Sequence, residues 1–160
     1  MSFQKQVNMY PAIAVEGDFA SVNPRASVLA IDAALVAGGN GVVVGRFAWA
    51  DDARVVNNTG TGAPTGFVSR RGNQAAITQW LGRGSMLVPA GMNVTLHNGG
   101  DFFAKTSTAS TIGQKVFAST TDGTVSTGAA GATIAGSIET EFYAVSAVSA
   151  GELLTISTRA

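Results

Sequence analysis

The chain has 160 residues and no cysteine, and its ten basic and ten acidic side chains cancel. A single domain of this length buries enough surface to fold without metal or disulfide staples, and the missing cysteines exclude disulfides, thiolate metal sites and thiol nucleophiles. Charged residues make up only 12% of the chain, about half the usual share, so part of the surface is expected to be hidden against partner proteins, and zero net charge argues against nucleic acid.

Residues 1–24 are predicted to form an extended N-terminal arm. Pro11 and Pro24 cannot donate to a strand ladder, and the apolar residues around them follow no sustained period. One interpretation is a frayed terminus. The other is an arm that docks on a neighbouring chain, because large apolar side chains such as Phe3 and Tyr10 are a poor choice for a tail left in water.

Several short strands are expected in the first half of the remaining chain. Residues 25–36 are interpreted as strand feeding a turn at 38–41, although their alanines also favour a helix. Residues 42–49 form the strongest strand, with alternating faces. Residues 55–56 form another strand. The loop 57–65 resembles a nucleotide-binding loop only superficially, because no Lys-Ser/Thr pair follows its glycines.

A segment rich in arginine follows a short Gly-Phe-Val run at 66–68. Arg70, Arg71 and Arg83 surround a stretch that also holds Trp80. Arginine and tryptophan are the residues most enriched at interface hot spots. The alternative is a solvated loop with a tryptophan in the core.

The only histidine falls in a predicted turn. Residues 86–88 and 93–96 are expected to be strands, 97–100 a turn, and 101–105 the returning strand. A catalytic histidine needs an orienting carboxylate and a nucleophile. His97 beside Asn-Gly-Gly is therefore interpreted as structural.

The last third of the chain has the clearest strand pattern, after a Ser/Thr/Ala loop at 106–111. Asp122-Gly123 predicts a two-residue type I′ hairpin turn. Short strands rich in Val, Ile, Thr and Phe are separated by Gly-bearing turns. We expect strands at 115–118, 124–126, 134–138, 142–146 and 153–157. The pattern predicts an all-β fold, a small antiparallel β-barrel or sandwich, with residues 25–160 forming a single β domain.

Sites for chemistry are not expected. One histidine without cysteine gives no zinc spacing, and no calcium loop or cofactor motif occurs. Glu139 and Glu141 share a strand face and could act as paired carboxylates, but a solvated strand face is the preferred interpretation. No apolar run reaches the roughly 18 residues of a membrane span, and residues 1–6 are not followed by a signal-peptide core.

The sequence resembles the capsid cement, or head decoration, proteins of tailed bacteriophages. The resemblance is carried by PAGMNVTLHNGGDFFAK (residues 89–105) and TIGQKVFASTTDGTVSTGAAGATIAGSIET (residues 111–140). The opening MSFQKQVNMYPAIAVEGDFASVNPR and the central VVVGRFAWAD and GAPTGFVSRR extend it over the full chain.

This resemblance implies a structural protein on the exterior of the virion, made in the bacterial host cytoplasm. It would bind the outside of the assembled head, bridge neighbouring subunits of the major capsid protein, and hold the shell against DNA pressure. Such proteins act as small homo-oligomers; a dimer is favoured and a trimer is the alternative. The family has no enzymatic motif, and no cofactor, metal, nucleic-acid or membrane partner is expected.

The arm and the arginine-rich segment are predicted to carry most of the inter-chain contact. The candidate residues are Phe3, Tyr10, Pro11 and Phe19 in the arm, and Arg70, Arg71, Trp80 and Arg83 in the segment. One competing interpretation is a carbohydrate- or receptor-binding β module with an aromatic platform of Trp49, Trp80 and Tyr143. Another is a small hydrolase that uses Glu139 and Glu141 or His97.

Overall fold

The computed structural model describes residues 13–30, 33–70 and 86–159, and all the regular elements in them are β-strands. Six strands form one sheet, in the spatial order β1 (Ala26–Ser27), β8 (Leu96–Gly99), β6 (Gly66–Val68), β4 (Phe47–Ala50), β5 (Val55–Asn57) and β2 (Val36–Ala37). Five form a second, in the order β11 (Val125–Gly128), β10 (Lys115–Ser119), β12 (Ser137–Ala144), β13 (Leu153–Ser157) and β9 (Asp101–Lys105). A two-stranded sheet joins β3 (Val42–Val43) and β7 (Leu87–Val88).

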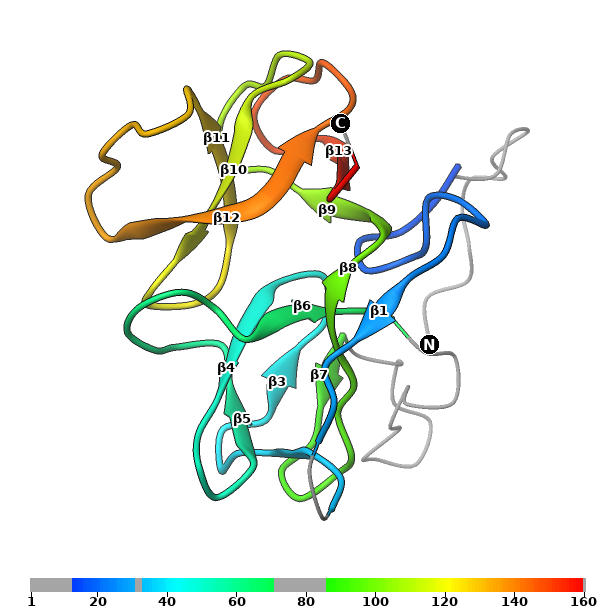
Figure 1. Ribbon diagram of the computed structural model, residues 1–160, viewed down its shortest axis with the longest axis vertical. Coiled ribbons are helices and arrows are strands. Elements are labelled where there is room, and N and C mark those ends of the chain that lie inside the picture. The colour runs from blue at the N-terminus through cyan, green and yellow to red at the C-terminus, as the bar shows by residue number, and fades with distance from the viewer. Residues whose placement is uncertain (1–12, 31–32, 71–85, 160) are drawn as a thin grey trace, which may run out of the picture.

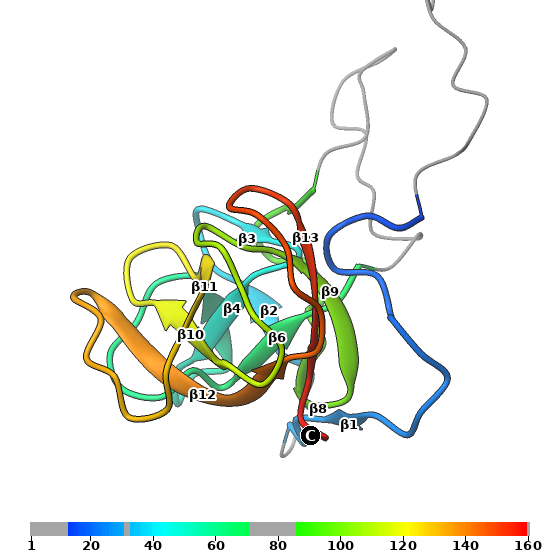
Figure 2. The same cartoon turned by 90° about the horizontal axis from the view of Figure 1, so that it is seen from above.

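Neighbouring strands are antiparallel except for the β2–β5 pair, which is parallel. The five-stranded sheet lies above the six-stranded sheet in Figure 1. β9 and β13 lie side by side in both views (Figures 1 and 2), paired from Leu153 opposite Lys105 to Ser157 opposite Asp101. None of the described strands closes a sheet into a barrel. The predicted all-β class is therefore confirmed, in its sandwich form.

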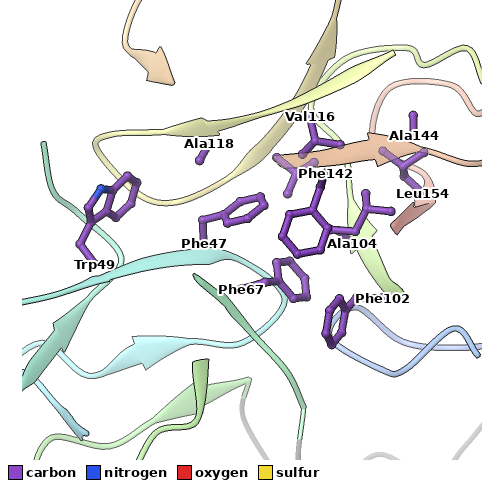
Figure 3. Close-up of a cluster of buried hydrophobic side chains, with 12 residues drawn as sticks. Phe47, Trp49, Phe67, Phe102, Ala104, Val116, Ala118, Phe142, Ala144 and Leu154 are labelled. Carbon is purple, nitrogen blue, oxygen red and sulfur yellow. The ribbon is translucent and has the colours of Figure 1, made fainter. Parts of the chain in front are cut away.

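Four phenylalanines join the two large sheets. Phe47 and Phe67 come from the six-stranded sheet, and Phe102 and Phe142 from the five-stranded sheet (Figure 3). Ring centroids are 5.1 Å apart for Phe67 and Phe102, and 5.6 Å apart for Phe47 and Phe142. Successive residues of a strand point to opposite faces. The inward face of each sheet therefore supplies every second residue to this shared core.

The other face of the six-stranded sheet is buried as well. Ala48, Val68 and Leu96 pack there against Val42 and Val88 of the two-stranded sheet, and all five side chains are at most 1% exposed. A strand buried on both faces needs apolar residues at consecutive positions. This explains the uninterrupted apolar run of β4.

The strand predicted over 42–49 is wrong, because the chain turns in its middle. Gly45 has a φ of 77°, and β3 and β4 on either side of it belong to different sheets. The amide of Gly45 donates to the carbonyl of Val68 at 2.9 Å, and that of Val44 to the carbonyl of Met86 at 2.8 Å. A left-handed φ is readily adopted by glycine.

The hairpin between β10 and β11 is present, but its turn is longer than predicted. Residues 120–124 separate the two strands, and Gly123 is the turn residue with positive φ, at 70°. Its amide donates to the carbonyl of Ser119 at 2.9 Å. A type I′ turn needs positive φ at two consecutive residues, so the two-residue turn is wrong.

The strands predicted at 115–118 and 153–157 are confirmed by β10 and β13, and 101–105 by β9. The two strands predicted at 134–138 and 142–146 are wrong. A single eight-residue strand, β12, begins after a turn at Gly136, where φ is 71°.

His97 lies in a strand, so the turn predicted at 97–100 is wrong. It sits inside β8 and is 3% exposed. The chain then passes through Gly100, with a φ of 130°, into β9 of the other sheet. The "returning" strand therefore pairs with β13 instead of β8.

The region 25–36 forms less strand than predicted. β1 covers two residues and β2 begins at Val36. The turn at 38–41 is present, with the Gly41 amide donating to the Gly38 carbonyl at 2.8 Å. β2 pairs with β5 instead of forming a hairpin across this turn.

Three outer edges of the two large sheets are covered by irregular segments of the same chain. Residues 17–20 bond to β9, residues 91–94 to β2, and residues 106–110 to β11. In the last case the amide of Ser107 donates to the carbonyl of Val125 at 2.8 Å. Covered edges cannot pair with foreign strands.

Candidate functional site

Residues 17–20 of the predicted arm pair with β9, the edge strand of the five-stranded sheet. The amide of Gly17 donates to the carbonyl of Phe103 at 2.7 Å, and the amide of Phe103 donates to the carbonyl of Asp18 at 2.9 Å. The amide of Ala20 donates to the carbonyl of Asp101 at 2.9 Å. Residues 17–20 therefore continue the sheet beyond β9 (Figure 1).

Phe19 anchors this segment. Its ring is half-buried, 5.5 Å from the Phe102 ring and edge-on to the His97 ring at 5.7 Å. The Arg25 guanidinium lies 3.9 Å above its centroid, in a cation–π contact. Much of the contact area of this predicted interface residue is thus made within its own chain.

Asp101, at the start of β9, is the polar centre of the same region. Its carboxylate accepts hydrogen bonds from Ser21 Oγ (2.5 Å), Asn23 Nδ2 (2.7 Å) and Ser157 Oγ (2.6 Å). Burial alone raises the pKa of Asp101, but these hydrogen bonds and the nearby Arg159 charge outweigh it and hold the pKa below its ordinary value. The Asp101 carboxylate thus holds together the arm, through Ser21 and Asn23, and the C-terminal strand β13, through Ser157.

Arg70, the first residue of the arginine-rich segment, lies beside the arm. The amide of Arg70 donates to the carbonyl of Gly17 at 2.7 Å, and its guanidinium donates to Asp18 Oδ1 at 3.0 Å. A Cβ on Gly17 would lie 2.5 Å from Val44 Cγ1, and Gly17 has a φ of 87°, so this close approach requires glycine. Because Val44 also bonds to Met86, Gly17 of the arm lies near Arg70 and Met86, the described residues on either side of 71–85.

We call this place the arm–arginine junction, and define it as residues 17–19, 44, 70 and 86. Of the eight predicted contact residues, the structure describes Phe19 and Arg70 and brings their segments together. The others lie outside the described residues: Phe3, Tyr10, Pro11, Arg71, Trp80 and Arg83.

A cleft of about 450 Å³ opens next to the junction. Its lining carries one acidic side chain, Glu16, and two basic ones, Arg46 and Lys105, while the rest of the wall is small or polar. The remaining lining residues are Gly45, Thr106, Ser107, Thr124, Ala150 and Gly151. No sequence signal indicated this cleft, because its walls come from segments far apart in the chain.

The catalytic alternatives find little support in the geometry. His97 is held between Ser27 Oγ (3.3 Å from Nδ1) and Ser69 Oγ (2.9 Å from Nε2), and Ser69 is only 2% exposed. A substrate cannot reach this buried pair. Glu139 accepts a hydrogen bond from the amide of Gly131 at 2.7 Å, which fixes the loop before β12.

The aromatic platform of a carbohydrate-binding module is also incomplete. Trp49 is 8% exposed and packs in the core shared by the sheets, with its Nε1 donating to the Gly62 carbonyl at 3.0 Å. Tyr143 is half-buried and carries the Lys115 ammonium 3.8 Å above its ring. Trp80 lies outside the described residues.

The described ranges contain no group of three or more His, Cys, Asp or Glu side chains placed to hold a metal ion. Residues 13–30, 33–70 and 86–159 include no helix long and apolar enough to cross a membrane.

Comparison with known proteins places the chain in a family. It is similar to a chain from the structure of the capsid of the Myoviridae phage XM1, with a TM-score of 0.64 and 19% identity, over 99% of this chain and 98% of that one. At this identity the likeness shows a shared fold. No curated protein matches the sequence. The profile of the XM1 gp53 minor capsid proteins matches residues 3–158, and the chain therefore belongs to the XM1 gp53 minor capsid protein family.

Proposed function

We propose that this chain binds the outer surface of the phage head and cements neighbouring subunits of the major capsid protein, so that the shell resists internal DNA pressure. Membership of a minor capsid protein family makes the chain a structural component of the virion. Beyond this, we propose that the chain lies on the exterior of the head, acts as a cement and has no enzymatic activity.

The observation that carries it is the arm–arginine junction. Residues 1–12 and 71–85 hold six of the eight candidate contact residues. The second segment lies between Arg70 and Met86 of the junction, and the first is separated from Gly17 of the junction by residues 13–16. Backbone hydrogen bonds fix the junction, from Arg70 to Gly17 and from Val44 to Met86. We propose that the aromatic residues of the first segment and the arginines and tryptophan of the second contact the same neighbouring subunit, because these residue types are enriched at interface hot spots.

The cleft beside the junction also supports capsid binding on this side of the molecule. Its basic side chains, Arg46 and Lys105, flank a recess large enough for a side chain or a short loop of a capsid subunit. A specific contact should bury more than about 1,000 Å². We propose that the junction, the cleft and contacts made by residues 1–12 and 71–85 together reach this size.

We further propose that the chain acts as a homo-oligomer, with a dimer favoured. An oligomer that touches several capsid subunits gains avidity, so each contact can be weak. The low charge content of the chain reduces the desolvation cost of burying its surface.

Deleting residues 2–12 is expected to weaken binding to undecorated heads at least about tenfold, a loss of about 1.4 kcal/mol. The reason is that the deletion removes Phe3, Tyr10 and Pro11 but keeps Phe19 and its contacts. Occupancy is measured by sedimentation of heads mixed with increasing protein. An unchanged melting temperature of the free protein controls for folding, and unchanged occupancy would contradict the role of the arm.

The triple variant Arg71→Ala, Trp80→Ala, Arg83→Ala is expected to lose binding to a similar extent, because hot-spot side chains typically contribute more than about 1 kcal/mol each. Arg54→Gln, in the turn before β5, is the control for removal of positive charge. Equal binding by the triple variant and the control would exclude the arginine-rich segment from the contact.

A further inference from the structure

One edge of the six-stranded sheet is left open, in contrast to the three edges that the chain covers itself. β1 is the outermost strand beside β8, and no described strand or segment lies beyond it. Figure 2 shows β1 at the margin of the molecule, next to β8. An edge that is neither covered nor charged is a template for another strand.

The backbone of β1 shows which groups point outward. The register shifts between Ala26 and Ser27. Beyond this irregularity Ser27 lies opposite His97, and the amide of Val28 donates to the carbonyl of Leu96 at 2.8 Å. This is the pattern around a non-hydrogen-bonded antiparallel pair. The N–H and C=O groups of Val28 therefore face β8, and those of Ser27 and Leu29 face away from the sheet.

The side chains of this edge do not protect it. Residues 26–30, Ala-Ser-Val-Leu-Ala, carry no charge, and the nearest charged group, Arg25, is stacked on Phe19. Leu29 is 86% exposed, although it is large and apolar. Of the features that keep natural edge strands from pairing, β1 has a short length and a register shift, but residues 26–30 carry no lysine, proline or inward charge.

We propose that β1 pairs antiparallel with β1 of a second copy of this chain, about a two-fold axis at Val28. Antiparallel pairing of identical strands is two-fold symmetric by construction, so the edge is its own partner. In this register Ser27 of each copy exchanges both backbone hydrogen bonds with Leu29 of the other, and the two Val28 residues face each other as a non-hydrogen-bonded pair.

The second copy is favoured over other occupants because an antiparallel edge is complementary to itself about a two-fold axis, and the charge pattern is compatible with this pairing. Like charges directly opposite each other destabilise a strand pair, and self-pairing over 26–30 brings none together. The pairing joins two six-stranded sheets into one and adds four backbone hydrogen bonds. A contact this short is expected to be weak in solution and to become effective when the head holds both copies close together.

The inference specifies the surface of the proposed homo-oligomer and rests on that part of the proposed function. Self-association is measured on the free protein and occupancy on heads, so the two can fail separately. A wild-type chain that stays monomeric yet still binds heads would overturn the β1 pairing and leave the cementing role standing.

Leu29→Pro removes an outward N–H on each copy, and it keeps the extended geometry of Val28 because the residue before proline favours extended backbone. The wild type is expected to show a mass by light scattering that rises with concentration towards twice 16.2 kDa, and Leu29→Pro to remain at one chain. Ile112→Pro is the matched control, because Ile112 is another large apolar residue that is 72% exposed. It lies in a turn in which the amide of Gln114 donates to the carbonyl of Thr111, just before Gly113 with its φ of 87°. Proline is favoured at this position of such a turn. A monomeric wild type up to about 1 mM, or equal masses for Leu29→Pro and wild type, would overturn the proposal.

Single cysteines test the register without disturbing the edge, because the chain has no other cysteine. Facing Val28 residues would have Cα atoms about 4.5 Å apart, within disulfide range, whereas the two Leu29 residues are displaced along the strands and lie beyond it. With oxidised glutathione, Val28→Cys is expected to give at least about tenfold more cross-linked dimer than Leu29→Cys, although Leu29 is the more exposed residue. More cross-linking at Leu29, or none at either position, would reject the two-fold axis at Val28.

Discussion

Replacing Phe67 with alanine is expected to lower the free energy of unfolding by about 3–5 kcal/mol, the range found for buried phenylalanines. Phe67 is completely buried between the two large sheets. Its ring centroid lies 5.4 Å from that of Phe47 and 5.1 Å from that of Phe102 (Figure 3). These neighbours are held in strands of different sheets, so they cannot collapse into the space left by the ring. Urea denaturation measures the loss as a lower midpoint with an unchanged slope.

Phe103→Ala is the matched control for this change. Phe103 is next to Phe102 in β9 but points to the opposite face of the sheet, where it is half-buried. We expect a loss of about 1–2 kcal/mol, because a partly exposed ring forfeits less transfer free energy and leaves no closed cavity. Equal losses at Phe67 and Phe103 would show that packing between the sheets is not what holds them together.

The positions of many strands could be predicted from the sequence, but the sheets to which they belong could not. The alternating and apolar runs located β9, β10 and β13 within a residue at each end. The run at 42–49 is equally apolar, yet Gly45 divides it between two sheets. Periodicity reports which residues are buried, and a strand buried on both faces gives the same pattern as two strands joined by a buried turn.

The arm–arginine junction could be predicted only in part. Aromatic and arginine content drew attention to Phe19 and Arg70, which the structure brings to neighbouring places. Asp101 was missed because its three side-chain partners are 80, 78 and 56 residues away in sequence. Each partner is a common polar residue without a motif, so only the folded chain shows that they converge.

Asp101→Asn is expected to weaken the attachment of residues 13–24 by about 2 kcal/mol, because hydrogen bonds to a charged group contribute roughly 1.5–3 kcal/mol and the variant keeps weaker neutral ones. The amides of Gly17 and Ala20, which donate to β9, should exchange with deuterium about thirtyfold faster. Asp52→Asn is the control, since Asp52 is exposed and makes the same change in charge. Unchanged exchange at both amides would mean that the backbone ladder to β9 holds the segment without Asp101.

The pH dependence of the wild type provides an independent test of this carboxylate. Since the pKa of Asp101 is lower in the folded chain than in the unfolded one, its stabilisation is complete above the unfolded pKa of about 3.9 and is lost as the pH falls through the folded pKa. The difference in free energy of unfolding between wild type and Asp101→Asn should therefore be constant from about pH 7 to 5 and vanish in stronger acid. A difference that does not shrink at all as the pH falls below the unfolded pKa would show that the substitution acts through packing. A difference that shrinks with falling pH would identify the Asp101 charge as the group that holds residues 21–23 against β9 and β13.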